Sequence, residues 1–520
     1  MSAAAAVFPD FAARFRARAG RLLETPAARQ RALIAGLVAF GLVWGAGVAL
    51  GGIGTALLAL SMVAAIACLI DFRAGVMILI IIMPISSSSV FPHAMFGMTG
   101  MNPLNLLLVM TLVTYLMNTA GDKSAGRFIP RPLWWLYIVP FVAAGLIGMW
   151  HVGEIPTIFK ASEMVYFDNA IGYLRDMMFK PLGLVVYALL IAAAVGRSKQ
   201  PERFVTPMFL SIFVMAALAV VFVATSGASL SELAGTYSRA FFSSLGMHAN
   251  DLGRLYAVAY ALLLFVWDRT DRIVLKTVLV FAMVTVALAL MLTFSRGAFL
   301  GFVIVNAIYL VSRRTIKTFI LAALLVPLAL IFAPGAIWSR LELGIGEGLG
   351  EITAGRFDEI WTPLMPEVLT TPPWGNGLGA IMWSKPMRFE EMMFVGHPHN
   401  AYLLAWLDTG LIGTLLLLAF WTYAWVSFRK LAKDVRIASE LQGFFEGAAA
   451  GLVSFLIAGF AGSSLMPVPE QSFLWLALGV MWGVKHHLVR AAAAKPEPAK
   501  KPKPRTATQP WEPGVGWGGR

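Results

Sequence analysis

The sequence predicts an all-α, polytopic bundle of transmembrane helices, because of its composition and its long apolar runs. Of the 520 residues, 58% are hydrophobic and only 13% are charged, a balance that ordinary soluble domains do not show. Runs of about 16 to 25 apolar residues recur, and each can cross a hydrocarbon core of about 30 Å as a helix. Membrane β-barrels show short segments of alternating polarity instead. We therefore expect about 12 to 14 spans, with a large extracytoplasmic loop between late spans.

The spans organise the chain from one end to the other. Residues 1–31 place Phe8, Phe11, Phe15 and Leu22 among arginines, which predicts a basic amphipathic helix on the inner leaflet. No cleavable signal is expected there, because long spans follow directly. Residues 489–520 are rich in Pro, Lys and Gly and predict a disordered basic tail. The candidate spans are residues 32–50, 52–70, 74–91, 103–118, 133–150, 181–196, 204–225, 249–267, 273–294, 297–312, 318–334, 400–428, 445–463 and 471–488.

The distribution of charge predicts the orientation of these spans. Lys and Arg accumulate in cytoplasmic loops, and a cytoplasmic N-terminus puts most of the 41 basic residues on that side. Both termini are then cytoplasmic, and residues 151–180, 226–248 and 335–399 are extracytoplasmic. The positive charge is spread over short loops, which indicates membrane topology, and no nucleic-acid partner is expected.

Two histidines end the largest of the extracytoplasmic loops. His397 and His399 immediately precede the apolar run that begins at Asn400. Imidazole is the side chain whose ordinary pKa lies near physiological pH, so this pair is a candidate for proton transfer. Asn400 is expected to cap the helix that follows. A metal would need a third ligand, such as His248, His151, His93 or an acid; no HExxH motif is present and Cys68 is the single cysteine, so we expect no metal site.

Arginines in the outer segments are candidates for binding a diphosphate. A guanidinium stays charged and can grip two phosphate oxygens with its planar fork. Arg296 stands out, because the positive-inside bias disfavours a cation at an outer turn between two spans. The other candidates are Arg239, Arg356 and Arg175. A structural alternative is equally open: Arg254 with Asp251, and Arg356 with Glu359, could form ordinary surface ion pairs worth at most about 1 kcal/mol.

Several of these segments together carry a resemblance to a known family. The run from His399 to Leu403, followed by Asp408-Thr409-Gly410-Leu411-Ile412-Gly413, resembles the signature of the O-antigen ligase and polymerase superfamily. Ser295-Arg296-Gly297-Ala298 resembles the turn that begins its shared domain. Further similar segments are Arg356 to Trp361, Pro373 to Gly379, and His248-Ala249-Asn250, which lacks the proline of the family's Pro-Asn element. The resemblance covers residues 235–430, and we divide the membrane part into N-terminal spans at 32–234 and a ligase-like domain at 235–488.

The resemblance implies a membrane glycosyltransferase of the GT-C-like kind that needs no cofactor. Such enzymes transfer a glycan from an undecaprenyl-diphosphate carrier to an acceptor hydroxyl on the periplasmic face of the bacterial inner membrane, in O-antigen or exopolysaccharide biosynthesis. The acceptor is lipid A core in ligases, another carrier-linked glycan in polymerases, and a protein in related O-oligosaccharyltransferases. An imidazole can remove the hydroxyl proton as the bond forms, and guanidinium groups can stabilise the departing diphosphate. We expect His399 to be the base, with His397 as the alternative, and Arg239, Arg296, Arg356 and Arg175 to bind the diphosphate, supported by Asn400 and Asn250.

Two questions stay open at the level of sequence. A transporter or flippase of lipid-linked glycans would also have many apolar spans, although it should carry polar residues at the centre of several of them. Here the charged candidates collect at one surface instead. No residue in the sequence identifies the acceptor, so ligase and polymerase are not separated.

Overall fold

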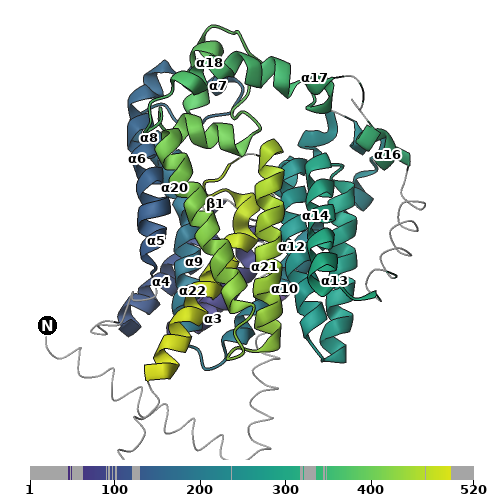
Figure 1. Ribbon diagram of the computed structural model, residues 1–520. Helices are drawn as coiled ribbons and strands as arrows, with labels where there is room; N and C mark the ends of the chain where they lie inside the picture. Colours follow the sequence, from purple (N-terminus) through teal and green to yellow (C-terminus); the bar gives the residue numbers. More distant parts are fainter. Residues whose placement is uncertain are drawn as a thin grey trace, which may run out of the picture.

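A computed structural model shows a bundle of long, roughly parallel helices capped at one end by shorter ones (Figure 1). It describes residues 62–88, 102–119, 129–235, 237–316, 335–342, 348–462 and 464–493, together with a few positions between these ranges. The all-α prediction is confirmed. In the described part, the extended structure is one antiparallel pairing of the two-residue strands β1 (Ala94–Met95) and β2 (Met98–Thr99).

Eight helical segments within the described residues are long and apolar enough to cross a membrane. Two more, α3–η1 (Phe72–Ile85) and α4 (Pro103–Thr119), are apolar but shorter, and α22 (Ser472–Ala493) packs against α9 inside the bundle. The eight are α5–η3 (Arg131–Glu154), α8–α9 (Ala170–Arg197, with α9 from Lys180), η5–α10 (Pro201–Ser226), α12 (Ala249–Arg269), α13 (Ile273–Leu292), α14 (Arg296–Arg313), α20 (Ala401–Leu431) and α21–η9 (Ser439–Ala461).

The predicted spans agree with these helices wherever the two can be compared. The tight break predicted at Ser295-Arg296 is present, since α13 ends at Leu292 and α14 begins at Arg296. The predicted spans 32–50 and 318–334, and most of 52–70, lie outside the described residues. The amphipathic helix predicted for residues 1–31 lies outside them as well. Helix α22 continues to Ala493, so the tail predicted as disordered from residue 489 is helical at its start, and the rest of it lies outside the described residues.

Small residues allow the central helices to approach closely. Gly447 of α21 faces α12, where an added Cβ would lie 2.5 Å from the Ala261 carbonyl oxygen. Gly479 of α22 faces α9, where an added Cβ would lie 2.5 Å from the Ala188 carbonyl oxygen. Membrane helices gain little from the hydrophobic effect when they associate, so contact at this distance adds the packing that holds them together.

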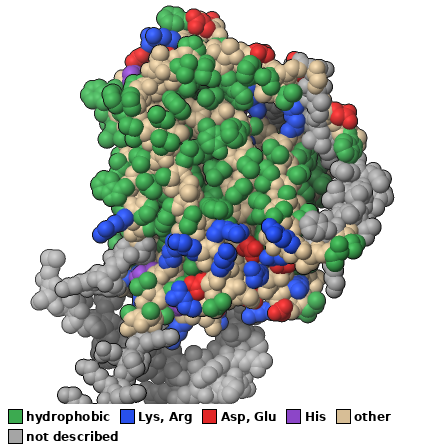
Figure 2. Space-filling model, viewed as in Figure 1, with side chains coloured by type: hydrophobic (Ala, Val, Ile, Leu, Met, Phe, Trp, Pro, Cys, Tyr) green, Lys and Arg blue, Asp and Glu red, His purple; other side chains and the backbone are tan. Residues whose placement is uncertain are grey.

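The two ends of the bundle differ in charge. Figure 2 shows a broad belt of apolar side chains, with Lys and Arg gathered along one edge of it. We call that edge the basic end. Helix α12 ends there at Arg269, α14 ends there at Arg313, and the last turn of α20 carries Arg429 and Lys430. The loop end lies opposite and carries the short helices α7 (Ile158–Ala161), α17 (Leu349–Ile352) and α18 (Thr362–Thr370) (Figure 1). This one-sided distribution is the pattern expected of a membrane protein with a fixed orientation.

A loop from the loop end locks onto α20. Gly410 interrupts this helix with φ 66° and ψ −175°, and an added Cβ would lie 2.3 Å from the Pro373 carbonyl oxygen. Two residues before the kink, the buried Asp408 carboxylate accepts hydrogen bonds from the N–H groups of Gly379 and Ala380, at 3.1 and 3.0 Å. At Gly410 the approaching partner is the loop at residues 373–375, which needs a backbone conformation that only glycine adopts readily.

Candidate active site

The start of α20 is fixed by local capping and by one contact with α21. The Asn400 side-chain oxygen accepts hydrogen bonds from the N–H groups of Tyr402 and Leu403, at 3.0 and 3.2 Å, which confirms the predicted cap. Tyr402 donates its hydroxyl to the Leu456 carbonyl oxygen at 2.6 Å, close to the end of α21. A capped and anchored helix start holds the residues just before it in a defined place.

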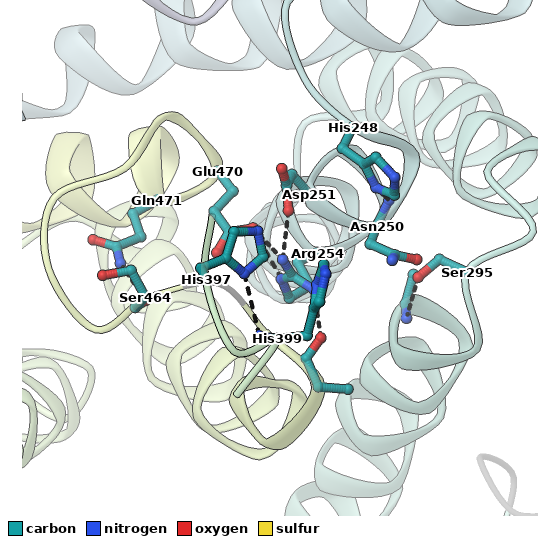
Figure 3. A network of polar contacts seen from close by, with 12 residues as sticks. His248, Asn250, Asp251, Arg254, Ser295, His397, His399, Ser464, Glu470 and Gln471 are labelled. Carbon is teal, nitrogen blue, oxygen red and sulfur yellow. Dashed lines mark hydrogen bonds and ion pairs between the residues drawn. The ribbon is translucent and has the colours of Figure 1, made fainter. Parts of the chain in front are cut away.

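Those preceding residues are the histidine pair, His397 and His399 (Figure 3). Their ring centroids lie 4.2 Å apart in an edge-to-face arrangement. His399 has φ +52°, a left-handed conformation that is uncommon outside glycine and often marks a functional site. The Trp361 indole N–H donates to the Pro398 carbonyl oxygen at 2.8 Å, so the outer loop clamps the peptide between the two histidines.

Beneath the histidine pair lies a buried ion cluster centred on Arg254 (Figure 3). The Arg254 side chain is only 3% exposed, and its Nη2 reaches one carboxylate oxygen of Asp251 and one of Glu470, each at 2.6 Å. Its Nε also donates to Glu470 at 2.9 Å, and its Nη1 donates to the Ala461 carbonyl oxygen at 3.2 Å. The predicted pairing of Arg254 with Asp251 is confirmed, but the expectation of a surface pair is wrong. Segments distant in sequence cover the guanidinium, and Glu470 supplies a second, buried carboxylate.

The electrostatic environment keeps His397 neutral. Burial lowers its pKa from 6.5 to about 4, and the positive charge of Arg254 acts in the same direction. Arg356 and His248 lower this pKa further, whereas Glu470 raises it. These influences place Arg356 and His248 within electrostatic range of the histidine pair.

Glu470 responds to its surroundings in the opposite sense. Burial raises the pKa of its carboxyl from 4.5 to about 7, and the neighbouring Asp251 carboxylate also raises it, against the effect of Arg254. Two carboxylates share one guanidinium, so the cluster has one more acidic group than it needs to balance its charge. A proton can therefore reside there near neutral pH.

The hydrogen bonds of the pair distinguish its two rings. His397 Nδ1 accepts the backbone N–H of His399 at 3.2 Å. A neutral imidazole that accepts through Nδ1 carries its proton on Nε2. With this bond made, the ring of His397 offers a donor to an incoming group and has no free acceptor nitrogen. Its low pKa makes it a weak base as well.

Three long helices begin around this cluster. His248 caps α12 by accepting the Asn250 N–H at 3.3 Å, Ser295 caps α14, and α20 starts at the Asn400 cap. The start of α12 packs tightly on the start of α14, because a Cβ added to Gly253 would lie 2.4 Å from the Ala298 Cβ. Helix N-termini carry partial positive charge and favour anions. These helix starts make this part of the loop end suited to a phosphate group, whereas the charge of Arg254 is already balanced by Asp251 and Glu470.

The structure places the predicted arginines at different distances from the histidine pair. Arg356 precedes η7 (Phe357–Trp361), the segment that clamps Pro398, and Arg296 is the first residue of α14. Arg175 lies on another part of the bundle and forms an ion pair with Asp176 at 2.9 Å. The side chain of Arg239, in η6 (Tyr237–Leu245), lies outside the described residues.

Glu470 is the member of the site that sequence reasoning missed. It lies in η10 (Pro469–Gln471), in the short connection between α21 and α22. The sequence does show that Glu470 is an acidic residue in a Pro-rich loop between two spans. Such a loop lies next to the outer ends of both spans, which could have indicated a place in the site. For metals, the described residues contain no group of three or more His, Cys, Asp and Glu side chains that could hold an ion.

Comparisons with known proteins give one match. Residues 278–418 match the family model described as O-antigen ligase. The matched range includes Arg296, Arg356, both histidines and the kink at Gly410, while Arg254 and Glu470 lie on either side of it. No curated protein and no solved structure matches the chain.

Proposed function

We propose that this protein transfers a glycan from an undecaprenyl-diphosphate carrier to an acceptor hydroxyl. The premise is that residues 278–418 match the O-antigen ligase family model, which supports membership of the O-antigen ligase and polymerase superfamily. The observation that supports this most is the placement of the histidine pair among the capped starts of α12, α14 and α20, with Arg296 as the first residue of α14. A base and an anion-binding region are the two functions that such a transfer requires.

In the proposed reaction, His399 removes the proton of the acceptor hydroxyl. The hydroxyl oxygen forms a bond to the anomeric carbon while the bond from that carbon to the diphosphate oxygen breaks. The electron pair of the broken bond leaves with the lipid diphosphate, whose added negative charge is stabilised by Arg296, Arg356 and the helix N-termini. We include Arg239 among the residues proposed to bind the diphosphate, because it lies in the outer segment at residues 226–248. A single displacement inverts the anomeric configuration and uses no metal.

The charge asymmetry supports an orientation for this chemistry. Lys and Arg gather at the basic end, which supports a cytoplasmic location for that end. The histidine pair at the loop end then faces the periplasm of the bacterial inner membrane, and both termini are cytoplasmic. The acceptor is a carrier-linked glycan or lipid A core; a protein acceptor is the alternative within this chemistry.

Transport of lipid-linked glycans gains less support from the structure. The buried Arg254 lies in the first turns of α12, and the buried Glu446 lies at the basic end, paired with Arg269 and Arg313 at 3.1 Å. Asp408, two turns into α20, is occupied by backbone N–H groups. Each of these charges is satisfied where it lies, whereas a transport path requires polar groups at mid-membrane that face a passage.

The test is an assay with purified protein, an undecaprenyl-diphosphate-linked glycan and either lipid A core or a second carrier-linked glycan. We expect His399→Ala to lower turnover by about 100-fold or more while donor binding persists, and Arg296→Ala to weaken donor binding. A product of retained anomeric configuration would refute single displacement. Normal turnover by His399→Ala, with loss of turnover in His397→Ala, would transfer the base to His397.

A further inference from the structure

A second site lies on the other side of the loop that carries Glu470. This site is a cavity of about 750 Å³. One wall is formed by η1 and the start of α4, and the opposite wall by the start of α9. Helix α3, which leads into η1, packs against both α4 and α9. The volume falls in the range of about 300–1,000 Å³ typical of ligand sites.

The mouth of this cavity has an excess of positive charge. Asp176 lines it and is shared by two cations, Lys180 at 2.6 Å and Arg175 at 2.9 Å. One carboxylate between two cations leaves one positive charge without an acidic counterpart in the trio, which suits a phosphate. Arg175, predicted to bind diphosphate, does not line the cavity itself but pairs with Asp176, which does. Phe179, also lining the mouth, is 61% exposed, as aromatic side chains at a membrane interface commonly are.

Deeper in, the cavity combines apolar walls with a hydroxyl that lacks a partner. Met83, Leu184 and Val468 are among the apolar residues that line it. Tyr187 lines it about 10 Å further along α9 than Lys180, at about 1.5 Å per residue. The Tyr187 side chain is buried, 6% exposed, and its hydroxyl has no hydrogen-bond partner among the residues that the structure describes. A buried hydroxyl without a partner is costly, and a bound polar group would satisfy it.

The cavity and the histidine pair share one wall. Pro467, Val468 and Pro469 line the cavity, while Glu470, the next residue, turns away to Arg254. Gln471 holds this loop together by donating from Nε2 to the Ser464 and Met466 carbonyl oxygens, at 3.0 and 2.7 Å. A ligand in the cavity is therefore separated from the Arg254 cluster by a single ordered loop.

We propose that this cavity binds the acceptor as a membrane lipid that carries both a phosphate and a saccharide. The inference rests on the proposed glycan transfer and adds to it a separate site for the second substrate. Apolar walls hold the chain, Arg175 and Lys180 hold the phosphate, and Tyr187 hydrogen-bonds a polar group of the lipid. The donor then occupies the site of the histidine pair, and the two lipids approach from opposite sides of the loop at residues 464–472.

The first experiment identifies the ligand. Photoreactive benzoylphenylalanine replaces Phe179 in the full chain, native membranes are irradiated, and the attached lipid is identified by mass spectrometry. We expect an adduct with a lipid that bears phosphate and saccharide, and its mass distinguishes an undecaprenyl-diphosphate glycan from lipid A core. Adducts with ordinary phospholipids alone, or no adduct, would overturn the proposal.

The second experiment blocks the cavity. Gly183 lines it, and a Cβ added there meets no atom within 4 Å, so Gly183→Phe fills the cavity without a clash at its first carbon. Gly153 also has open space around it but lies outside the cavity, so Gly153→Phe is the matched control. We expect Gly183→Phe to lower the lipid adduct about tenfold and to raise KM for the acceptor while KM for the donor is unchanged.

The outcomes separate this site from the proposed function. Wild-type levels of adduct and an unchanged acceptor KM in Gly183→Phe would overturn the site while leaving the transfer reaction intact. A strong saccharide-lipid adduct in a protein that transfers to no acceptor would instead overturn the proposed function and leave the lipid site standing. Tyr187→Phe, which removes only the unpaired hydroxyl, should weaken the adduct less than Gly183→Phe does.

Discussion

The cluster around Arg254 predicts strong coupling between two carboxylates. Asp251 and Glu470 each reach the same nitrogen of the guanidinium at 2.6 Å. Asp251→Asn or Glu470→Gln alone leaves Arg254 one carboxylate and keeps an acceptor oxygen in place, so each should cost about 1 kcal/mol or less. The double variant leaves a buried guanidinium with no carboxylate, which costs about 3–5 kcal/mol. The difference is a coupling free energy of about 1–3 kcal/mol.

The assay is unfolding of each variant in mixed micelles at increasing denaturing detergent, followed by tryptophan fluorescence. Glu446→Gln is the matched control, because Glu446, like Glu470, is a buried carboxylate paired with arginine but lies at the basic end. This variant should lower stability without changing glycan transfer. If the free energies of the two single variants simply add in the double variant, the shared counter-charge is refuted.

The same cluster should make stability depend on pH. The pKa of Glu470 is raised from 4.5 to about 7, so the fold favours its protonated form. Its contribution to stability is then complete below about pH 4.5 and is lost as the pH rises through about 7. Glu470→Gln should remove this loss, and an unchanged pH profile in that variant would contradict the assignment.

Three further predictions concern the histidine pair and α20. The pKa of His397 is lowered from 6.5 to about 4, so its contribution to stability is complete above about pH 6.5 and lost as the pH falls through 4; His397→Gln should remove that acid-side loss in unfolding curves. Asn400→Ala removes the cap of α20 and should cost about 1 kcal/mol of stability, with a larger loss of turnover if the cap positions His399. Gly410→Ala forces a side chain into a conformation that only glycine adopts readily and against the Pro373 carbonyl oxygen. We expect it to lower the free energy of unfolding by about 3 kcal/mol or more. The control Gly183→Ala adds a methyl group in open space and should leave the free energy of unfolding unchanged.

Local features of the site could be predicted from the sequence. The cap at Asn400, the break before Arg296 and the pairing of Arg254 with Asp251 all involve residues within about one helical turn. The apolar spans also follow from composition, because a hydrocarbon core demands about 20 apolar residues whatever the neighbouring helices are.

Distant contacts could not be predicted in this way. Glu470 joins Arg254 across 216 positions of the chain, and Trp361 reaches Pro398 from the outer loop. Both contacts depend on which helices lie side by side, and apolar periodicity does not specify the neighbours of a membrane helix.

The sequence by itself therefore determined that this is a helical membrane protein, that its histidine pair precedes a capped helix, and which family it resembles. Only the tertiary structure decided that Arg254 is a buried centre rather than a surface pair, that Arg175 pairs with a residue lining a different cavity, and that one loop separates this cavity from the Arg254 cluster. The physical reason is range: hydrophobicity and capping act within a segment, whereas burial of a charge is fixed by every segment that packs around it.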